Sequence, residues 1–119
     1  MARAKEGHIS KAILRHTRVS PQKARLVVDM VRGQRVERAL EILECCDKKT
    51  APLVKKLLLS AVANAKEQSK VDVDELFVKR AWVDAGRTFH RVMPRARGSA
   101  SPIIKRHSTI TVVLDEIGA

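Results

Sequence analysis

Apolar residues recur at the three- and four-residue spacing of an α-helix in three stretches between residues 20 and 65. The first stretch begins at Ser20, a typical N-cap ahead of Pro21, and ends at Gly33, a typical C-terminal stop. Its periodic apolar positions are Ala24, Val27, Met30 and Val31. The pattern predicts a helix with one buried face.

The second and third stretches are amphipathic in the same way. Residues 36–44 place glutamates opposite an apolar face made of Val36, Leu40 and Leu43. In the third stretch Thr50 can cap a helix that has Pro52 in its first turn. The apolar residues that follow helical spacing there are Val54, Leu57, Leu58, Ala61, Val62 and Ala65. We therefore predict three successive helices.

β-Strands are predicted on both sides of this helical block. Residues 8–19 and 76–83 are rich in β-branched or other strand-forming side chains. In residues 107–114, Ile110, Val112 and Leu114 alternate with residues of the opposite face. The order β-α-α-α-β-β indicates an α+β domain, with three helices packed on one face of a small antiparallel three-stranded sheet.

The segment between the last two strands, residues 86–107, is too long and too polar to be an ordinary loop. A structureless connection of about 20 residues is uncommon inside a compact domain. We therefore predict a long protruding β-hairpin at about residues 85–105, with its tip between Pro94 and Pro102. An isolated two-stranded ribbon is marginal in water, so its arms should be mobile in the free protein. About residues 8–84 and 106–115 form the globular body of a single domain spanning residues 1–119.

Positive charge is concentrated at the two ends of the chain. Lys and Arg number 24 against 13 Asp and Glu, a net charge of +11. Residues 1–29 carry seven cations and two acids, residues 85–114 carry six and none, and residues 30–84 carry eleven and nine. Cations without acids repel one another, which predicts that both basic ends bind a polyanion. Four lysines close to acids are interpreted as a solvated surface: Lys48, Lys49, Lys55 and Lys56.

The sequence has no evident signature of an enzyme, a metal site or a membrane protein. Nucleophile elbows, glycine-rich phosphate loops and zinc spacings do not occur. The clustered acids, Asp72, Asp74, Glu75 and Asp84, are interpreted as a solvated turn rather than as metal ligands. The longest apolar run, residues 57–63, is far short of the roughly 20 residues of a bilayer span. No catalytic residue, cofactor, metal or membrane partner is predicted.

The adjacent Cys45 and Cys46 fit reduced thiols, because a bridge between them would be strained. The first ten residues are basic but have no apolar stretch behind them, so they do not resemble a targeting signal. Both features predict a cytoplasmic location.

Nucleic acid is the polyanion that fits the basic segments best. The aromatic residues Phe77, Trp82 and Phe89 are too few for the stacking platforms that bind single strands. Five of the six hairpin cations are arginines, which suit forked phosphate contacts. We expect recognition through phosphates and shape in a folded RNA. An architectural DNA-bending protein is the alternative, because such proteins also use basic ribbons with a proline near the tip.

Three motifs carry a family resemblance. The segment "VSPQKARLVVDMVRG" (residues 19–33) is similar to the first-helix signature of the large-subunit ribosomal protein family numbered twenty-two. "LLLSAVANA" (residues 57–65) resembles its third helix, and "VMPRARGSA" followed by "HSTITVVL" resembles its hairpin tip and last strand. The match covers about residues 8–115 and is closest to the bacterial form. It implies a non-catalytic structural constituent of the large ribosomal subunit.

The resemblance also implies where the chain binds. In the family the body lies near the polypeptide exit, and the hairpin contacts several rRNA domains, supports assembly and lines the nascent-polypeptide exit tunnel. Carried over by position, the tip would comprise Val92, Met93, Pro94, Arg95, Ala96, Arg97, Gly98, Ser99 and Ala100. Charge and resemblance together indicate these RNA-binding residues: Arg15, Arg18, Lys23, Arg25, Arg80, Arg87, His90, Arg91, Arg95, Arg97, Lys105 and Arg106.

The implied partners are the large-subunit rRNA, the nascent polypeptide and neighbouring ribosomal proteins, including protein four at the tunnel constriction. One residue departs from the family pattern. Many members have a basic residue after the tip glycine, where this chain has Ser99. A third tip cation is therefore missing here, whereas Arg95 and Arg97 are present.

Overall fold

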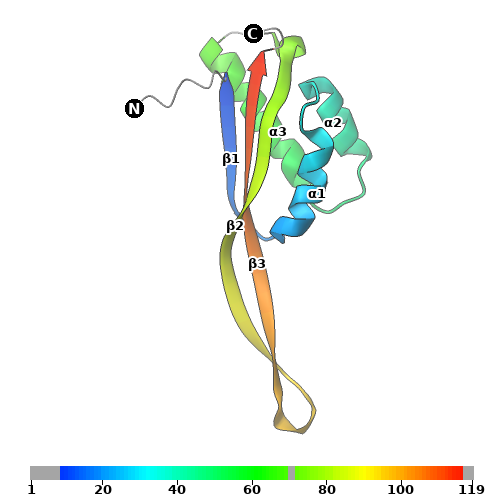
Figure 1. Ribbon diagram of the computed structural model, residues 1–119, viewed down its shortest axis with the longest axis vertical. Coiled ribbons are helices and arrows are strands. Elements are labelled where there is room, and N and C mark those ends of the chain that lie inside the picture. The colour runs from blue at the N-terminus through cyan, green and yellow to red at the C-terminus, as the bar shows by residue number, and fades with distance from the viewer. Residues whose placement is uncertain (1–8, 70–71, 117–119) are drawn as a thin grey trace.

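The computed structural model describes residues 9–69 and 72–116. Its elements, in chain order, are β1 (Ser10–Thr17), α1 (Pro21–Val31), α2 (Val36–Cys45), α3 (Ala51–Ser69), β2 (Leu76–Pro94) and β3 (Ala100–Glu116), with short 3-10 turns at Val73–Glu75 and Ala96–Gly98. The helices lie on one face of an antiparallel sheet of order β1-β3-β2, and β2 and β3 continue away from the body as a hairpin (Figure 1). The predicted α+β class, with its three helices, three-stranded sheet and protruding hairpin, is confirmed.

Helix α1 begins and ends where the sequence predicts, but its buried face differs in one position. Pro21 occupies the first turn, and Gly33 follows the helix with a φ of 81°, a left-handed conformation that favours glycine. The buried side chains are Ala24, Val27, Val28 and Val31. Met30 was predicted to be buried and is instead 39% exposed, because it lies beside this stripe and Val28 completes it.

The core between the helices and the sheet is aliphatic. Among the described residues, its largest fully buried side chains include Leu58 of α3, Leu76 of β2, and Ile110 and Leu114 of β3. The hydroxyl of Ser10 in β1 is buried as well and donates to a main-chain carbonyl of α3, at 2.9 Å. Apolar burial therefore holds the helices to the sheet, and the predicted alternation in the last strand is correct, since Ile110, Val112 and Leu114 all face the core.

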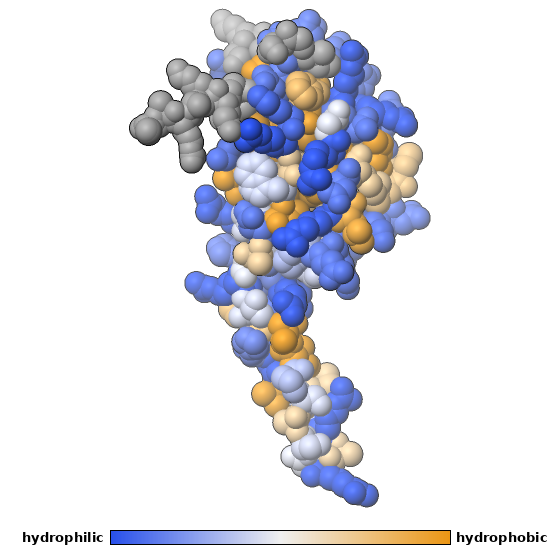
Figure 2. All heavy atoms as spheres, viewed as in Figure 1, coloured by the Kyte–Doolittle hydropathy of each residue, from blue (hydrophilic) through white to orange (hydrophobic). Residues whose placement is uncertain are grey.

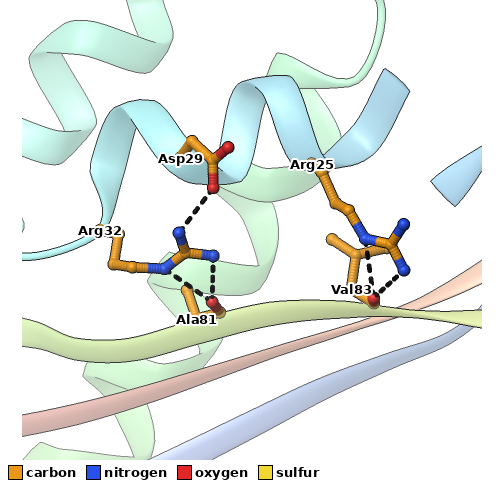
Figure 3. A network of polar contacts seen from close by, with 5 residues as sticks. All are labelled: Arg25, Asp29, Arg32, Ala81 and Val83. Carbon is orange, nitrogen blue, oxygen red and sulfur yellow. Dashed lines mark hydrogen bonds and ion pairs between the residues drawn. The ribbon is translucent and has the colours of Figure 1, made fainter. Parts of the chain in front are cut away.

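Two arginines of α1 tie this helix to the edge strand β2. Arg25 donates from Nε and Nη2 to the Val83 carbonyl, at 3.3 and 2.9 Å. Arg32 donates from Nε and Nη2 to the Ala81 carbonyl, at 3.0 and 2.7 Å, and from Nη1 to Asp29 (Figure 3). An edge strand leaves every second carbonyl without a strand partner, and here the guanidinium groups supply the missing donors.

The link between α1 and α2 covers the next part of the same edge. The Gly33 N–H donates to the Val78 carbonyl, and the Val78 N–H donates to the Gln34 carbonyl, each at 2.9 Å. Arg35 also forms an isolated antiparallel bridge with Phe77. These contacts protect the β2 edge from pairing with another chain.

The hairpin begins where the third strand of the sheet ends. β1 pairs with β3 only as far as Thr17 and Ser108, whereas β2 and β3 stay paired out to Pro94 and Ala100. The arm beyond the body is about 30 Å long at about 3.3 Å per residue. The molecule measures 64 × 40 × 20 Å, and its radius of gyration is 17.5 Å. A compact domain of this length would have a radius of about 13.5 Å, so the hairpin protrudes.

A β-bulge lies at the base of the hairpin. Between Ala85 and Thr88, β2 has one residue more than the facing part of β3. Gly86 lies in this bulge, where an added Cβ would stand 3.2 Å from the main-chain oxygen of His107. Only glycine allows this close approach without a shift of one strand, and a bulge increases the local twist of the pair.

Two neighbouring leucines of α3 separate core packing from helix propensity. Leu58 is 1% exposed and Leu59 is 47% exposed. We expect Leu58→Ala to lower the free energy of unfolding by about 2–5 kcal/mol, because it leaves a cavity in the core. Leu59→Ala should change it by about 0.5 kcal/mol or less. Urea unfolding of the isolated chain measures both, and equal losses would contradict this packing.

Candidate nucleic-acid interface

The hairpin has no interior of its own. None of residues 86–107 is buried, and every residue from 89 to 100 is exposed. Apolar side chains stand in solvent there, with Val92 at 69%, Ile104 at 47% and Met93 at 42% exposure. Figure 2 shows such apolar side chains along the hairpin, among hydrophilic ones. Only the main-chain ladder between β2 and β3 and local side-chain contacts hold the ribbon together.

The hairpin cations are not neutralised within the described residues. Ion pairs within the described residues include those of Arg32 with Asp29, Arg38 with Glu41, Lys55 with Glu44, and Lys79 with Asp115. None of these pairs involves a hairpin cation. The hairpin also does not fold back on the helices, as its long paired arms show (Figure 1). Its positive charges are therefore available to an external anion.

The tip is a tight turn closed by its own hydrogen bonds. The Arg95 N–H donates to the Ser99 carbonyl at 2.7 Å, and Arg95 Nε donates to Ser101 Oγ at 3.2 Å. Ser99, the residue that departs from the family pattern, donates from its hydroxyl to the Ala96 carbonyl at 2.9 Å. A lysine or arginine could not make this short contact, so Ser99 gives up a tip charge and stabilises the turn.

Arg97 and Gly98 both have left-handed backbones, with φ of 63° and 73°. This conformation costs a residue other than glycine about 1–2 kcal/mol. Arg97 is therefore held in an unfavourable conformation on a fully exposed turn. Two successive residues with positive φ are usual in a tight hairpin turn, where Asn-Gly or Asp-Gly is the preferred pair, so the turn places arginine at a position that these smaller residues normally occupy.

Ring contacts brace the base of the hairpin next to the bulge. The rings of Phe89 and His107 meet edge to face, with centroids 4.9 Å apart and planes at 84°. His107 Nδ1 lies 3.0 Å from the Arg87 carbonyl. Further out, the Arg91 guanidinium lies 5.8 Å from the Phe89 ring centroid. Phe89 therefore holds one hairpin cation in place through a cation–π contact.

The structure brings some of the predicted body residues together and separates others. Arg18, Lys23 and Arg106 line one cavity at the base of the hairpin. Arg15 and Arg80 are exposed on β1 and β2, and His90 is exposed in the hairpin. Arg25 is different, because two of its nitrogens serve the Val83 carbonyl in the helix–sheet contact.

Lys49 lines the same cavity as Arg18, Lys23 and Arg106. It was interpreted from sequence as part of a solvated surface because acids precede it in the chain. That interpretation fits Lys55, which pairs with Glu44 at 2.8 Å and lowers the pKa of this carboxyl. Lys49 is exposed, and the fold also places it on the wall of this cavity, which no local sequence signal could have revealed.

Acidic residues gather at the end of the sheet opposite the hairpin. The short turn Val73–Glu75 precedes β2, and Asp115 and Glu116 end β3 beside it. A hydrogen bond with Glu116 and, to a smaller extent, repulsion from its charge raise the pKa of Glu75 above its ordinary value. The start of β2 and the end of β3 lie at the opposite end of the sheet from the hairpin tip (Figure 1), so these acids are far from the hairpin cations and the described residues are polarised in charge.

Other predicted features have simple surroundings. Cys45 is exposed and Cys46 half-buried, and both are free thiols. In the part of the chain that the structure describes, no three His, Cys, Asp or Glu residues are grouped as metal ligands would be. Asp72 instead accepts a hydrogen bond from the Asp74 N–H, as in a capped turn. No described helix is long and apolar enough to cross a membrane. His8, the predicted start of the first strand, lies outside the described residues.

A protein-family model described as "Ribosomal protein L22p/L17e" matches residues 12–115 of this chain. The matched region begins within β1 and continues through the helices and both arms of the hairpin to Asp115, near the end of β3.

The hairpin should open more readily than the body in the isolated protein. The Ala81–Val112 pair belongs to the three-stranded sheet under the helices, whereas the His90–Ile104 pair belongs to the uncovered ribbon. We expect amide hydrogens of residues 88–105 to exchange at least about tenfold faster than those of residues 110–114, since local stability follows buried contact. Hydrogen exchange followed by NMR measures this, and equal protection would contradict it.

The raised pKa of Glu75 predicts a pH-dependent gain from its removal. The folded chain holds this proton more tightly than the unfolded chain, so the stabilising contribution is complete at low pH and is lost as pH rises through the folded pKa. Glu75→Gln keeps a neutral partner for Glu116, and we expect a higher melting temperature at about pH 7 and little change at about pH 3. Glu67→Gln, on the exposed surface of α3, is the control. A Glu75→Gln gain that is the same at both pH values would count against this repulsion.

Proposed function

The chain belongs to the ribosomal protein L22p/L17e family and is a structural constituent of the large ribosomal subunit, and we propose that it acts there by binding rRNA with its hairpin and the adjoining surface of its body. The members of this family are generally structural and not enzymes. The proposal includes the division predicted from sequence, with a body at about residues 8–84 and 106–115 and a hairpin at about residues 85–105.

One observation carries the proposal: a ribbon without a single buried residue holds six cations that pair with no described carboxylate. Its charges repel one another and its arms are marginally stable alone. RNA phosphates around the ribbon would neutralise the charges and cover both of its sides. Binding thus supplies the surroundings that an ordinary strand pair obtains from a protein core.

Folded RNA fits this surface better than the DNA alternative. Arginines offer forked donors to phosphate without reading base edges, which suits a partner recognised by shape. The family match supports RNA as well, whereas nothing comparable supports duplex DNA. The acidic end of the sheet would be repelled by RNA, so the polarised charge favours approach with the hairpin leading.

The tip is proposed to line the nascent-polypeptide exit tunnel. Residues 92–100 are all exposed; Arg95 precedes the turn that Ser99 closes and Arg97 lies within it. In this arrangement the two arms contact rRNA, and the tip faces the nascent polypeptide and neighbouring ribosomal proteins, including protein four. Because the turn is closed by its own hydrogen bonds, it can keep its shape at the tunnel wall, where a moving peptide passes on one side.

Charge reversal at the tip tests this function. We expect the double variant Arg95→Glu, Arg97→Glu to enter large subunits at a reduced level, about tenfold or more below the unchanged chain, because the tip has to pass through the rRNA to reach the tunnel and two acids would be repelled by the phosphates around it. The measurement is the ratio of tagged variant to unchanged chain in subunits purified from cells that express both.

Lys56→Glu is the matched control, since it reverses an exposed charge on α3, away from the hairpin. Circular dichroism of the isolated variants should show unchanged helices in both. Normal incorporation of the tip variant, or a loss just as large for Lys56→Glu, would refute the proposed role of the tip.

A further inference from the structure

Four cations from four separate segments line one cavity at the base of the hairpin. They are Arg18 from the β1–α1 link, Lys23 from α1, Lys49 from the α2–α3 link, and Arg106 from β3. The cavity has a volume of about 530 Å³, and no carboxylate lines it. These residues lie far apart in sequence, so the fold assembles the cluster.

Nothing among the described residues neutralises this cluster. None of the four side chains takes part in the ion pairs of residues 9–69 and 72–116. Repulsion among the four cations lowers the stability of the folded chain. Lys23, Lys49 and Arg106 are exposed, so core packing does not explain why these cations lie together. An anion bound in the cavity would offset this repulsion.

The cavity also has a fixed framework for an anion. Arg18 Nη1 donates to the Arg106 carbonyl at 3.3 Å, which joins the start of α1 to the hairpin arm. Ser20 lines the cavity, and its side chain makes no capping hydrogen bond to α1. The Ser20 hydroxyl can therefore donate a hydrogen bond to an anion, and the positive end of the α1 dipole lies beside it.

Two apolar side chains complete the wall. Ile104 is 47% exposed and lines the cavity together with the half-buried Val19. A free inorganic anion makes no favourable contact with apolar side chains. A nucleotide does, because its ribose or base lies beside its phosphate.

We infer that this cavity binds one backbone phosphate of the large-subunit rRNA, with the attached nucleotide against Ile104. The inference rests on the proposed rRNA-binding function and adds to it a discrete site and a new residue, Lys49. Arg106 lies on the hairpin side of the cavity, whereas Lys23 of α1 and Lys49 of the α2–α3 link lie on the side of the helical layer, so one phosphate bridges the two parts. The bound RNA thereby sets the direction in which the hairpin leaves the body.

The experiment compares Lys49→Gln with Lys48→Gln in the full chain. Lys48 is adjacent and exposed but does not line the cavity, so both variants lose the same charge from the same link. Binding to large-subunit rRNA is measured against salt concentration, and phosphorothioate interference maps the contacted phosphates. Thermal unfolding of each variant confirms that both remain folded.

We expect Lys49→Gln to weaken binding about five- to tenfold and to reduce the salt slope by about one, because one phosphate contact is lost. It should also remove one position from the interference map. Lys48→Gln should keep the slope and the map of the unchanged chain.

Two other outcomes overturn the inference in different ways. Equal slopes and maps for the two variants, with steep salt dependence in the unchanged chain, reject the site and leave the proposed function standing. Binding by the unchanged chain that is absent or insensitive to salt rejects the proposed function, and the site with it.

Discussion

Repulsion among cations that no described acid balances is the constraint on which the shape of this molecule depends. The hairpin extends about 30 Å from the body at about 3.3 Å per residue, with no buried residue from 86 to 107. Repulsion among these cations favours an extended ribbon over a compact one, because extension keeps the charges apart and in contact with water. A phosphate-rich partner would supply the counter-charges that the described part of the chain lacks.

The body and the hairpin share the same two strands, and contacts from α1 fix one of these strands within the body. β3 is the central strand of the sheet and also one hairpin arm, and β2 is both the edge strand and the other arm. Arg25 and Arg32 fix α1 along β2 up to Val83, two residues before the bulge begins. The bulge at Gly86 is thus the first point where the strand pair can change direction without disturbing the core.

Local patterns in the sequence were sufficient for the fold and for the existence of the hairpin. Pro21 and Gly33 mark the ends of α1, and the absence of acids from residues 85–114 reveals a segment that needs an external partner. The helical periodicity was wrong for Met30: on the buried face of α1 the structure has Val28 in its place, and Met30 is exposed. Local sequence patterns could not predict contacts between distant segments. Arg25 donates to a carbonyl of the edge strand, and Lys49 lies in a cluster of four cations from separate parts of the chain.

The position of this cluster bears on how the direction of the hairpin is set. Among the described residues, the contacts between the hairpin and the helical layer lie at its base, next to the bulge. A phosphate held between Arg106 and the two lysines of the helical layer would add a second contact at this base, so the hairpin would be joined to the body on both sides of the cavity before its tip meets a partner. The Arg18 contact with the Arg106 carbonyl supplies the same restraint, more weakly, before RNA is bound. On binding, the hairpin would then become ordered from its base toward its tip, because its base has more contacts with the rest of the chain than its tip.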